Sequence, residues 1–211
     1  MPPKRKQIRN SIRRHNKKLP SDLILIVCED AVSAPAYFYA IVSQRKPTFL
    51  EIRGEECGSD PRSVVRYAVE LIRKRKKEPK YDQVWCVIDR DQHPDKVLND
   101  ARQLAKSKNI KLVISVPCFE IWYLLHFSYS AKPYTDFRSL NQDLKSIDGF
   151  ENYSKSDPPI EVLLPETDTA IKNSKRLRAS NEKSGSENPA TDLDKVVESL
   201  QERIRENDDD S

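Results

Sequence analysis

Two apolar stretches of the chain stop abruptly at carboxylates. Residues 23–28 (LILIVC) are followed by Glu29, and residues 84–88 (VWCVI) are followed by Asp89 and Asp91. Residues two apart in an extended backbone point to the same side, so the carboxylates of Asp89 and Asp91 can converge. If the two strands are neighbours in a sheet, Glu29 faces this pair across a gap of roughly 5 Å. The spacing therefore predicts a site with three carboxylates.

Three carboxylates in one place repel one another, and a divalent cation relieves that repulsion. Mg²⁺ (or Mn²⁺) prefers oxygen ligands and would activate a water molecule or stabilise a phosphoryl group. The alternative interpretation is that each acid caps a helix or solvates the sheet edge. A single acid would favour that alternative, whereas a Glu together with an Asp-x-Asp motif favours a metal site. The neighbouring acids Asp30 and Asp82 are assigned to the surface.

Two further residues are candidates for the same site. His93 lies two residues beyond Asp91, where it can contact a phosphate or relay a proton, although a histidine in a loop is usually inert. Glu120 begins an apolar helical segment, EIWYLLHF, and the helix dipole favours a carboxylate there as a cap. In the same segment His126 falls on an aromatic stripe, which favours a core histidine with one hydrogen bond. Arg90 lies between the two Asp residues and should point away from them.

The elements that position these residues alternate between strands and helices. Apolar, β-branched runs predict four strands, at 23–28, 48–54, 84–89 and 111–116. Helical spacing predicts helices at 33–46, with Ser33 as N-cap, at 60–77, opened by Asp60 and Pro61, and from Pro94 and Asp95 onward. Strands that alternate with helices form a mostly parallel α/β sheet with helices on both faces. Function in such folds collects at the carboxyl ends of the strands, where the acidic residues fall.

Beyond residue 117 the chain is expected to be mostly helical. Candidate helices lie near 136–146 and 167–178, and Thr191 is expected to cap a last helix to about Arg205. The predicted organisation is a basic flexible arm (1–20), an α/β domain (21–130), a helical region packed on it (131–206) and an acidic tail (207–211).

The basic arm differs in composition from the rest of the chain. Of the 37 Lys and Arg residues in the 211-residue chain, residues 1–20 hold eight, and they hold no acid. The eight are Lys4, Arg5, Lys6, Arg9, Arg13, Arg14, Lys17 and Lys18. Such an arm attracts polyanions by counterion release, and nucleic acid, either DNA or RNA, is the expected partner. The alternative is a solvated tail that aids solubility.

Membrane, secreted and zinc-binding classes are not favoured. The N-terminus lacks the apolar core of a signal peptide, and no run of about 18 apolar residues occurs. The four cysteines form no CxxC pair, and Cys28 and Cys86 lie inside predicted core strands. A reduced, cytoplasmic protein without a zinc site or a membrane span is therefore expected.

Three segments within roughly residues 20–130 resemble the RloB-like proteins. They read LIVCEDAVSAPAYF, VWCVIDRDQH and SVPCFEIWYLLHF, and the third is the most specific. The N-terminal domain of that family is related to the Toprim fold, so the resemblance implies a Toprim-like, mostly parallel four-stranded sheet. It also implies Mg²⁺ held by Asp89 and Asp91, Glu29 as general acid or base and metal-side ligand, and a site role for Glu120. RloB-like proteins are associated with bacterial anti-phage and restriction loci, which implies a nuclease-type effector and leaves room for a protein partner from a defence system.

The chain departs from the family pattern directly after Glu29. The family usually has Gly and then Lys-Thr-Glu before Pro, whereas this chain has Asp30 and then Val32, Ser33 and Ala34. These changes affect the tight turn beside Glu29, and they remove a phosphate-binding Lys and a carboxylate.

Three functions are compatible with the sequence, and whether the chain is an enzyme stays open. The first is a Mg²⁺-dependent nuclease of the Toprim type. The second is a non-catalytic nucleic-acid-binding or regulatory module that kept the fold with a degenerate site. The third is a receiver-like phosphoacceptor, with Glu29 and Asp30 as metal acids, Asp89 as acceptor, and Ser115 and Lys132 downstream.

Overall fold

The computed structural model describes residues 23–42, 49–54, 57–58, 60–75, 78–91 and 93–209. The eight basic residues of the arm lie outside these ranges, so their contact with nucleic acid stays a prediction. Residues 43–48, which hold the predicted end of the first helix and the predicted start of the second strand, also lie outside them.

Four parallel strands form the sheet within the described ranges. They are β1 (Leu23–Cys28), β2 (Leu50–Arg53), β3 (Tyr81–Asp89) and β4 (Lys111–Ser115), in the spatial order β2-β1-β3-β4. The predicted α/β class and parallel sheet are confirmed. β1 and β3 are neighbours, which is the condition for Glu29 to face the Asp pair. Cys28 at the end of β1 lies opposite Val87 of β3. The carboxyl ends of β1 and β3 therefore lie side by side.

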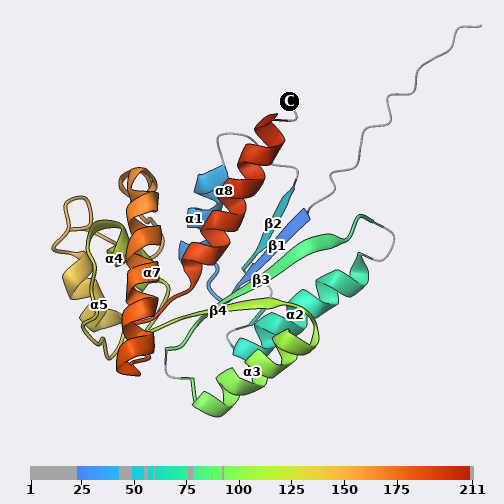
Figure 1. Ribbon diagram of the computed structural model, residues 1–211, viewed down its shortest axis with the longest axis horizontal. Helices are drawn as coiled ribbons and strands as arrows, with labels where there is room; N and C mark the ends of the chain where they lie inside the picture. Colours follow the sequence, from blue (N-terminus) through green and yellow to red (C-terminus); the bar gives the residue numbers. More distant parts are fainter. Residues whose placement is uncertain are drawn as a thin grey trace, which may run out of the picture.

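Helices connect the strands and continue beyond β4. The first three are α1 (Ser33–Val42), α2 (Pro61–Lys74) and α3 (Asp95–Ser107). Beyond β4 follow α4 (Glu120–Phe127), α5 (Phe137–Leu144), α6 (Ile160–Leu163), a 3₁₀ turn (Leu164–Glu166), α7 (Thr167–Ser184) and α8 (Leu193–Asp209). Figure 1 shows α4, α5 and α7 gathered beside one end of the sheet. None of the helices in the described part of the chain is both long and apolar enough to cross a membrane.

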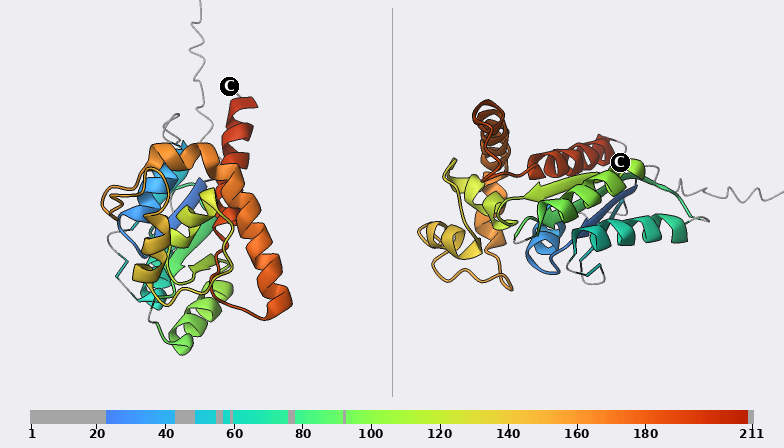
Figure 2. Two further views of the ribbon diagram at one scale, coloured as in Figure 1. Left: turned by 90° about the vertical axis from the view of Figure 1, so that its left-hand side faces the viewer. Right: turned by 90° about the horizontal axis from the view of Figure 1, so that it is seen from below.

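The sheet buries both of its faces. On β1, Ile24 and Ile26 join a core with α1, α4, α7 and α8. Leu25 and Val27 join a second core with α2 and α3, and Figure 2 shows α8 and α2 on opposite sides of the sheet. All six residues of β1 are buried, which explains why its apolar pattern is continuous rather than alternating. The first core reaches Leu200, so the helical C-terminal region shares it with the sheet.

The start of α1 differs from the sequence prediction. Ser33 is the first residue of the helix rather than its N-cap. The capping role falls to Asp30, whose carboxylate accepts hydrogen bonds from the backbone N–H groups of Val32 and Ala34, both at 2.9 Å. Asp30 is partly exposed, and it has a structural role there, because its carboxylate satisfies N–H groups that the helix leaves without partners.

The later helices are longer or more numerous than predicted. α6 was not expected, because Pro159 and Pro165 bracket its single turn. α7 continues to Ser184, where Gly185 ends it in the left-handed conformation with φ of 71°. α8 extends to Asp209, so part of the predicted acidic tail belongs to that helix.

The helical region is tied to the sheet by backbone hydrogen bonds beside β4. The Val116 N–H donates to the Ala190 carbonyl at 2.7 Å, and the Ala190 N–H donates back to the Val116 carbonyl at 3.1 Å. The Asn188 side chain bonds in the same reciprocal way to the backbone of Tyr134, at 3.1 and 2.7 Å. The segment between α7 and α8 is thereby fixed against the end of the sheet.

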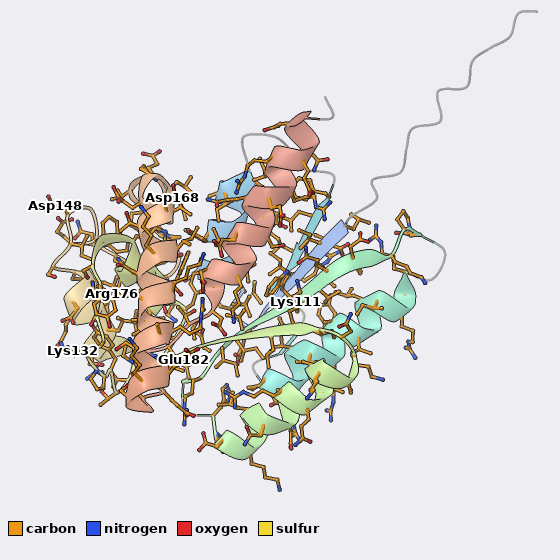
Figure 3. All side chains as sticks on the ribbon, in the orientation of Figure 1. Lys111, Lys132, Asp148, Asp168, Arg176 and Glu182 are labelled. Atoms are coloured by element: carbon orange, nitrogen blue, oxygen red, sulfur yellow. The ribbon has the colours of Figure 1, made fainter. Side chains whose placement is uncertain are left out.

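A buried ion cluster joins α7 to α8. Asp194 is fully buried and receives two hydrogen bonds from the Arg178 guanidinium, at 3.0 and 2.7 Å. Ser174 donates a third at 2.9 Å, and Asp192 also pairs with Arg178. Outside this cluster, Figure 3 shows charged side chains of both signs along α7, including that of Arg176.

Candidate acidic site at the carboxyl edge of the sheet

Glu29 directly follows β1 and is held against the end of β3. Its backbone N–H donates to the Val87 carbonyl at 2.9 Å, which extends the strand pairing by one residue. Its side-chain Oε2 accepts a hydrogen bond from the Asp89 backbone N–H at 3.0 Å. The two strand ends therefore bring Glu29 and Asp89 together, while the catalytic and metal-binding roles of both stay predictions.

The turn after Glu29 is built by Asp30 instead of the glycine that the family usually has. Gly54, which follows β2, packs directly on this turn. A Cβ at position 54 would lie 2.7 Å from the Asp30 carbonyl oxygen and 3.0 Å from Pro35. Only a glycine lets β2 approach the turn this closely. The departure at position 30 thus leaves a tight turn in place, stabilised by the Asp30 side chain.

Asp89 and Asp91 lie on either side of a sharp change in backbone direction. Asp89 is the last residue of β3 and is 8% exposed. Asp91 has a φ of 40°, in the left-handed region, so the extended-strand argument for its convergence with Asp89 is wrong. The Asp91 N–H donates to the Pro117 carbonyl at 2.8 Å. A turn fixed against the chain after β4, rather than strand geometry, therefore positions the Asp91 carboxylate.

Arg90 points away from this pair of carboxylates, as predicted. Its guanidinium pairs with Asp95 at 2.7 Å and with Glu187 at 3.4 Å. It borders a cavity of about 420 Å³ that Asp91, Tyr134 and Asn188 also line. The acidic site therefore opens on one side into a recess whose far wall is the segment fixed by Asn188.

His93 reaches back to Glu29 from the loop after Asp91. Its Nε2 lies 3.0 Å from Oε1 of Glu29, and its backbone N–H donates to the Arg90 carbonyl at 2.9 Å. When Nε2 carries the proton that Glu29 accepts, Nδ1 is the ring nitrogen that can take a proton. Glu29 therefore orients the His93 ring, and the predicted proton relay by His93 stays a prediction.

Glu120 is the first residue of α4 and is fully buried. Its Oε1 accepts a hydrogen bond from the Tyr153 hydroxyl at 3.0 Å and pairs with Nζ of Lys155 at 3.2 Å. Its Oε2 is buried without a hydrogen-bond partner. A carboxylate that only capped its own helix would not need a lysine and a tyrosine from a distant loop. Glu120 therefore does more than cap its own helix, and its role in the site stays a prediction.

Sequence reasoning missed Tyr153 and Lys155. Both lie in the polar segment between α5 and α6, where neither a motif nor a periodic pattern marks them. Their nearness to Glu120 depends on how this segment folds back over the start of α1, where the Ser33 hydroxyl donates to the Lys155 carbonyl at 3.5 Å. A local pattern could not have found them, because the contact joins residues more than 30 positions apart in the sequence.

Burial and mutual repulsion raise the pKa values of the carboxyl groups at this edge. Burial raises the pKa of Asp89 well above its ordinary value, and the charges of Glu120 and Asp91 raise it further. The pKa of Asp91 is raised mainly by burial, with Lys155 acting in the opposite direction. Burial also raises the pKa of Glu29, and its hydrogen bonds from Asp89 and His93 offset only part of that rise. The site therefore holds more acid than its own cations neutralise.

The residues at this edge fit Mg²⁺ or Mn²⁺ in their chemistry. Within the described ranges, no three His, Cys, Asp or Glu side chains form a ready-made metal cluster. Mg²⁺ usually takes only one or two carboxylates, however, and completes its shell with water and substrate phosphate. In the same ranges no hydrogen bond or ion pair reaches the carboxylates of Asp89 and Asp91. These two groups would hold the ion, with Glu29 beside them.

The side chains of three other residues bond to groups outside this site. His126 is a buried core histidine, as predicted, but it has two hydrogen bonds: Nδ1 donates to the Trp122 carbonyl at 2.8 Å, and Nε2 faces the Tyr37 hydroxyl at 2.9 Å. Ser115 is buried, with its hydroxyl 3.1 Å from that of Thr191. Lys132 pairs with Asp143 at 3.0 Å instead of reaching toward Asp89, which argues against the receiver-like interpretation.

Comparison with known proteins adds one finding to this geometry. The family model described as RloB-like protein matches residues 24–200. The match includes β1, β3, α4 and most of the helical C-terminal region, and it therefore extends well past the segments that suggested the resemblance. No curated protein and no solved structure matches the chain.

Proposed function

Because the chain belongs to the RloB-like family, we propose that it is a Mg²⁺-dependent nuclease of the Toprim type. The observation that carries the proposal is Asp89, a largely buried strand-end residue whose carboxylate has no hydrogen bond or ion pair with any described group. Glu29 and Asp91 adjoin it, and all three have raised pKa values. Titratable groups with strongly perturbed pKa values cluster at functional sites.

The proposed chemistry divides among the residues at this edge. Asp89 and Asp91 would hold the divalent ion, which supplies charge stabilisation for a phosphoryl group and activates water. Glu29 holds the His93 ring through Nε2, so that Nδ1 can take a proton from the attacking water. Glu120 lies on the other side, where it fixes the Lys155 ammonium.

The proposed substrate is nucleic acid, either DNA or RNA. The eight basic residues between Lys4 and Lys18 would hold its backbone through their charge and leave cleavage to the acidic site. The family resemblance further suggests a role in bacterial anti-phage defence, with a protein partner from the same system. A reduced, cytoplasmic setting is part of the same proposal.

The test replaces Asp89 by Asn and measures cleavage of single- and double-stranded DNA and RNA in Mg²⁺ and in Mn²⁺. We expect a loss of cleavage of about a thousandfold, because the ion loses its buried ligand. Nucleic-acid binding should stay within about twofold, since the arm is unchanged. The matched control is Asp82→Asn, an exposed acid on the same strand, which should cleave like the wild type. Equal cleavage by Asp89→Asn and wild type would refute the mechanism.

A second candidate function is a non-catalytic nucleic-acid-binding module. It is favoured by Glu29, whose two oxygens already face Asp89 and His93, and by the absence of a ready-made three-ligand cluster in the described ranges. This candidate predicts no cleavage of any nucleic acid in Mg²⁺ or Mn²⁺. It also predicts salt-dependent binding that weakens when residues 1–18 are removed.

A further inference from the structure

Lys155 is the one basic side chain paired with the buried Glu120 among the described residues. Its Nζ lies 3.2 Å from Oε1 of Glu120, although its own side chain is 44% exposed. The ammonium therefore reaches into the site from the solvent side and leaves two of its three N–H donors for other partners. Oε2 of Glu120 is buried without a partner, so this carboxylate is only half satisfied by the protein.

Contacts hold both the backbone carbonyl and the side-chain ammonium of Lys155 in place. Its carbonyl accepts a hydrogen bond from the Ser33 hydroxyl, and Ser33 in turn is held by the Tyr123 hydroxyl, which donates to the Ser33 carbonyl at 3.0 Å. Its Nζ lies 4.6 Å from the centre of the Phe137 ring, within the range of a cation–π contact. The ammonium is thus held toward Glu120 instead of moving freely at the surface.

The charges of Glu120 and Lys155 act together on the two carboxylates that lack partners. The Asp91 N–H donates to the carbonyl of Pro117, three residues before Glu120, so the Glu120–Lys155 pair lies beside this end of the sheet. There the charge of Glu120 raises the pKa values of Asp89 and Asp91, and the charge of Lys155 lowers them. In two-metal sites the two ions stabilise the attacking and leaving oxygens of the phosphoryl group, and the second ion also places positive charge beside the surrounding acids. Here a lysine already occupies that electrostatic role for Glu120.

We propose that Lys155 takes the place of a second metal ion in this site: its ammonium neutralises Glu120, so that one divalent cation binds at Asp89 and Asp91. The remaining N–H donors of Lys155 then face the phosphate that this cation holds. The inference rests on the proposed metal-dependent function and deepens it. The family usually has a Lys at position 32, where this chain has Val32. Lys155 would supply the basic group that is missing there.

The test is a titration of the full chain with Mn²⁺ followed by electron paramagnetic resonance of the free ion. Lys155→Met removes the charge and keeps the length, and we expect it to bind Mn²⁺ about tenfold more tightly, because one positive charge near the ligands is gone. Lys155→Arg keeps the charge and should stay within about twofold of the wild type. The matched control is Lys175→Met, a half-exposed lysine that pairs with Glu198, which should not change the affinity.

A double variant checks whether Lys155 acts through Glu120. Adding Glu120→Gln to Lys155→Met removes one negative and one positive charge, so the Mn²⁺ affinity should return to within about threefold of the wild type. If Lys155 only stabilised the fold, Lys155→Met would lower the melting temperature and leave the Mn²⁺ affinity unchanged. That result, or weaker Mn²⁺ binding by Lys155→Met, would overturn the inference.

Failure of the proposed function and failure of the inference give different results. If Lys155→Met tightens Mn²⁺ binding but no nucleic acid is cleaved, the nuclease proposal fails and the role of Lys155 stands. If cleavage depends on metal and Lys155→Met leaves Mn²⁺ affinity unchanged, only the role of Lys155 fails. If neither the wild type nor Lys155→Met binds Mn²⁺, the proposed function and the role of Lys155 both fail. Where cleavage occurs, the rate should rise with about the first power of Mn²⁺ concentration in the wild type and approach the second power in Lys155→Met.

Discussion

Asp194 and Asp89, two of the three buried carboxylates in the described part of the chain, have opposite surroundings. Asp194, between α7 and α8, is fully buried and receives hydrogen bonds from Arg178 and Ser174. Asp89, at the end of β3, is 8% exposed, and no described group donates a hydrogen bond to its carboxylate. A buried charge is tolerated when it is paired and is costly when it is not. The first arrangement stabilises the fold, and the second leaves a charge for a ligand to neutralise.

The contrast shows where the fold accepts a loss of stability. Arg178 is shared between Asp192 and Asp194, so the α7–α8 junction is balanced by its own residues. At the sheet edge the side chains of Lys155 and His93 contact Glu120 and Glu29 instead of Asp89. Uncompensated charge at a site that a ligand completes is a common trade of stability for activity.

The largest expected effect on stability comes from removing Arg178, which pairs with Asp192 and Asp194 between α7 and α8. Arg178→Met leaves the Asp194 charge buried and unpaired, and we expect the free energy of unfolding to fall by about 3 kcal/mol. Urea denaturation followed by circular dichroism measures this change. Adding Asp194→Asn should recover much of the loss, because the unpaired charge is then removed. Mn²⁺ affinity should not change, and a change would mean that the two regions are coupled.

The second prediction concerns His126, a buried base that is satisfied while neutral. Burial lowers its pKa to about 4 from an ordinary value near 6.5. Between these pH values the unfolded chain binds more protons than the folded chain, so this contribution to stability is lost as the pH falls. We expect a loss of about 2 kcal/mol between pH 7 and pH 4.5 that His126→Gln does not show. Urea midpoints of both proteins at several pH values measure it, and parallel pH profiles would contradict it.

The third prediction is a gain in stability, the opposite of the loss expected for Arg178→Met. Asp89→Asn should raise the free energy of unfolding at pH 7 by about 1 kcal/mol, because it removes a charge that the folded state disfavours. The pKa of Asp89 is raised in the folded state, so the wild type gains stability on acidification as this carboxyl is protonated. The difference between the two proteins should therefore shrink as the pH falls below 7. A loss of stability in Asp89→Asn would show that Asp89 is balanced after all.

The smallest effect is expected at an exposed ion pair. Lys132 and Asp143 are 3.0 Å apart, with 62% and 35% of their side chains exposed. Lys132→Ala should change the free energy of unfolding by less than about 0.5 kcal/mol, because water screens such pairs. It should leave any cleavage unchanged. A loss of more than about 1 kcal/mol in that free energy would show that water does not screen this pair.

Much of the α/β region could be predicted because its signals are local. The apolar run of β1 and the Asp60–Pro61 start of α2 appear in the structure as expected, since strand burial and helix capping depend on neighbouring residues. The start of α1 was misplaced by local reasoning. Asp30 and Ser33 are both good capping residues, and which of them caps depends on how the turn packs against Gly54.

The candidate site could be predicted only in part. Glu29 and Asp89 meet because they follow neighbouring strands, which the alternation of strands and helices indicated. Asp91 is positioned by a left-handed turn that no sequence pattern marked. Lys155 joins the site from a polar segment through contacts with Glu120 and Ser33. Such contacts between distant positions depend on the tertiary fold, and a single sequence does not reveal them.

The reciprocal backbone bonds between Val116 and Ala190 have a practical consequence for dissecting the chain. A fragment that stops near residue 130 would lose the partner of Val116 and expose the apolar side chains of α4, such as Trp122 and Leu125, that the later helices cover. Such a fragment should aggregate on expression, because the exposed surface is a large apolar patch. Truncation experiments should therefore keep α7 and α8 with the sheet and treat residues 23–209 as one cooperative unit.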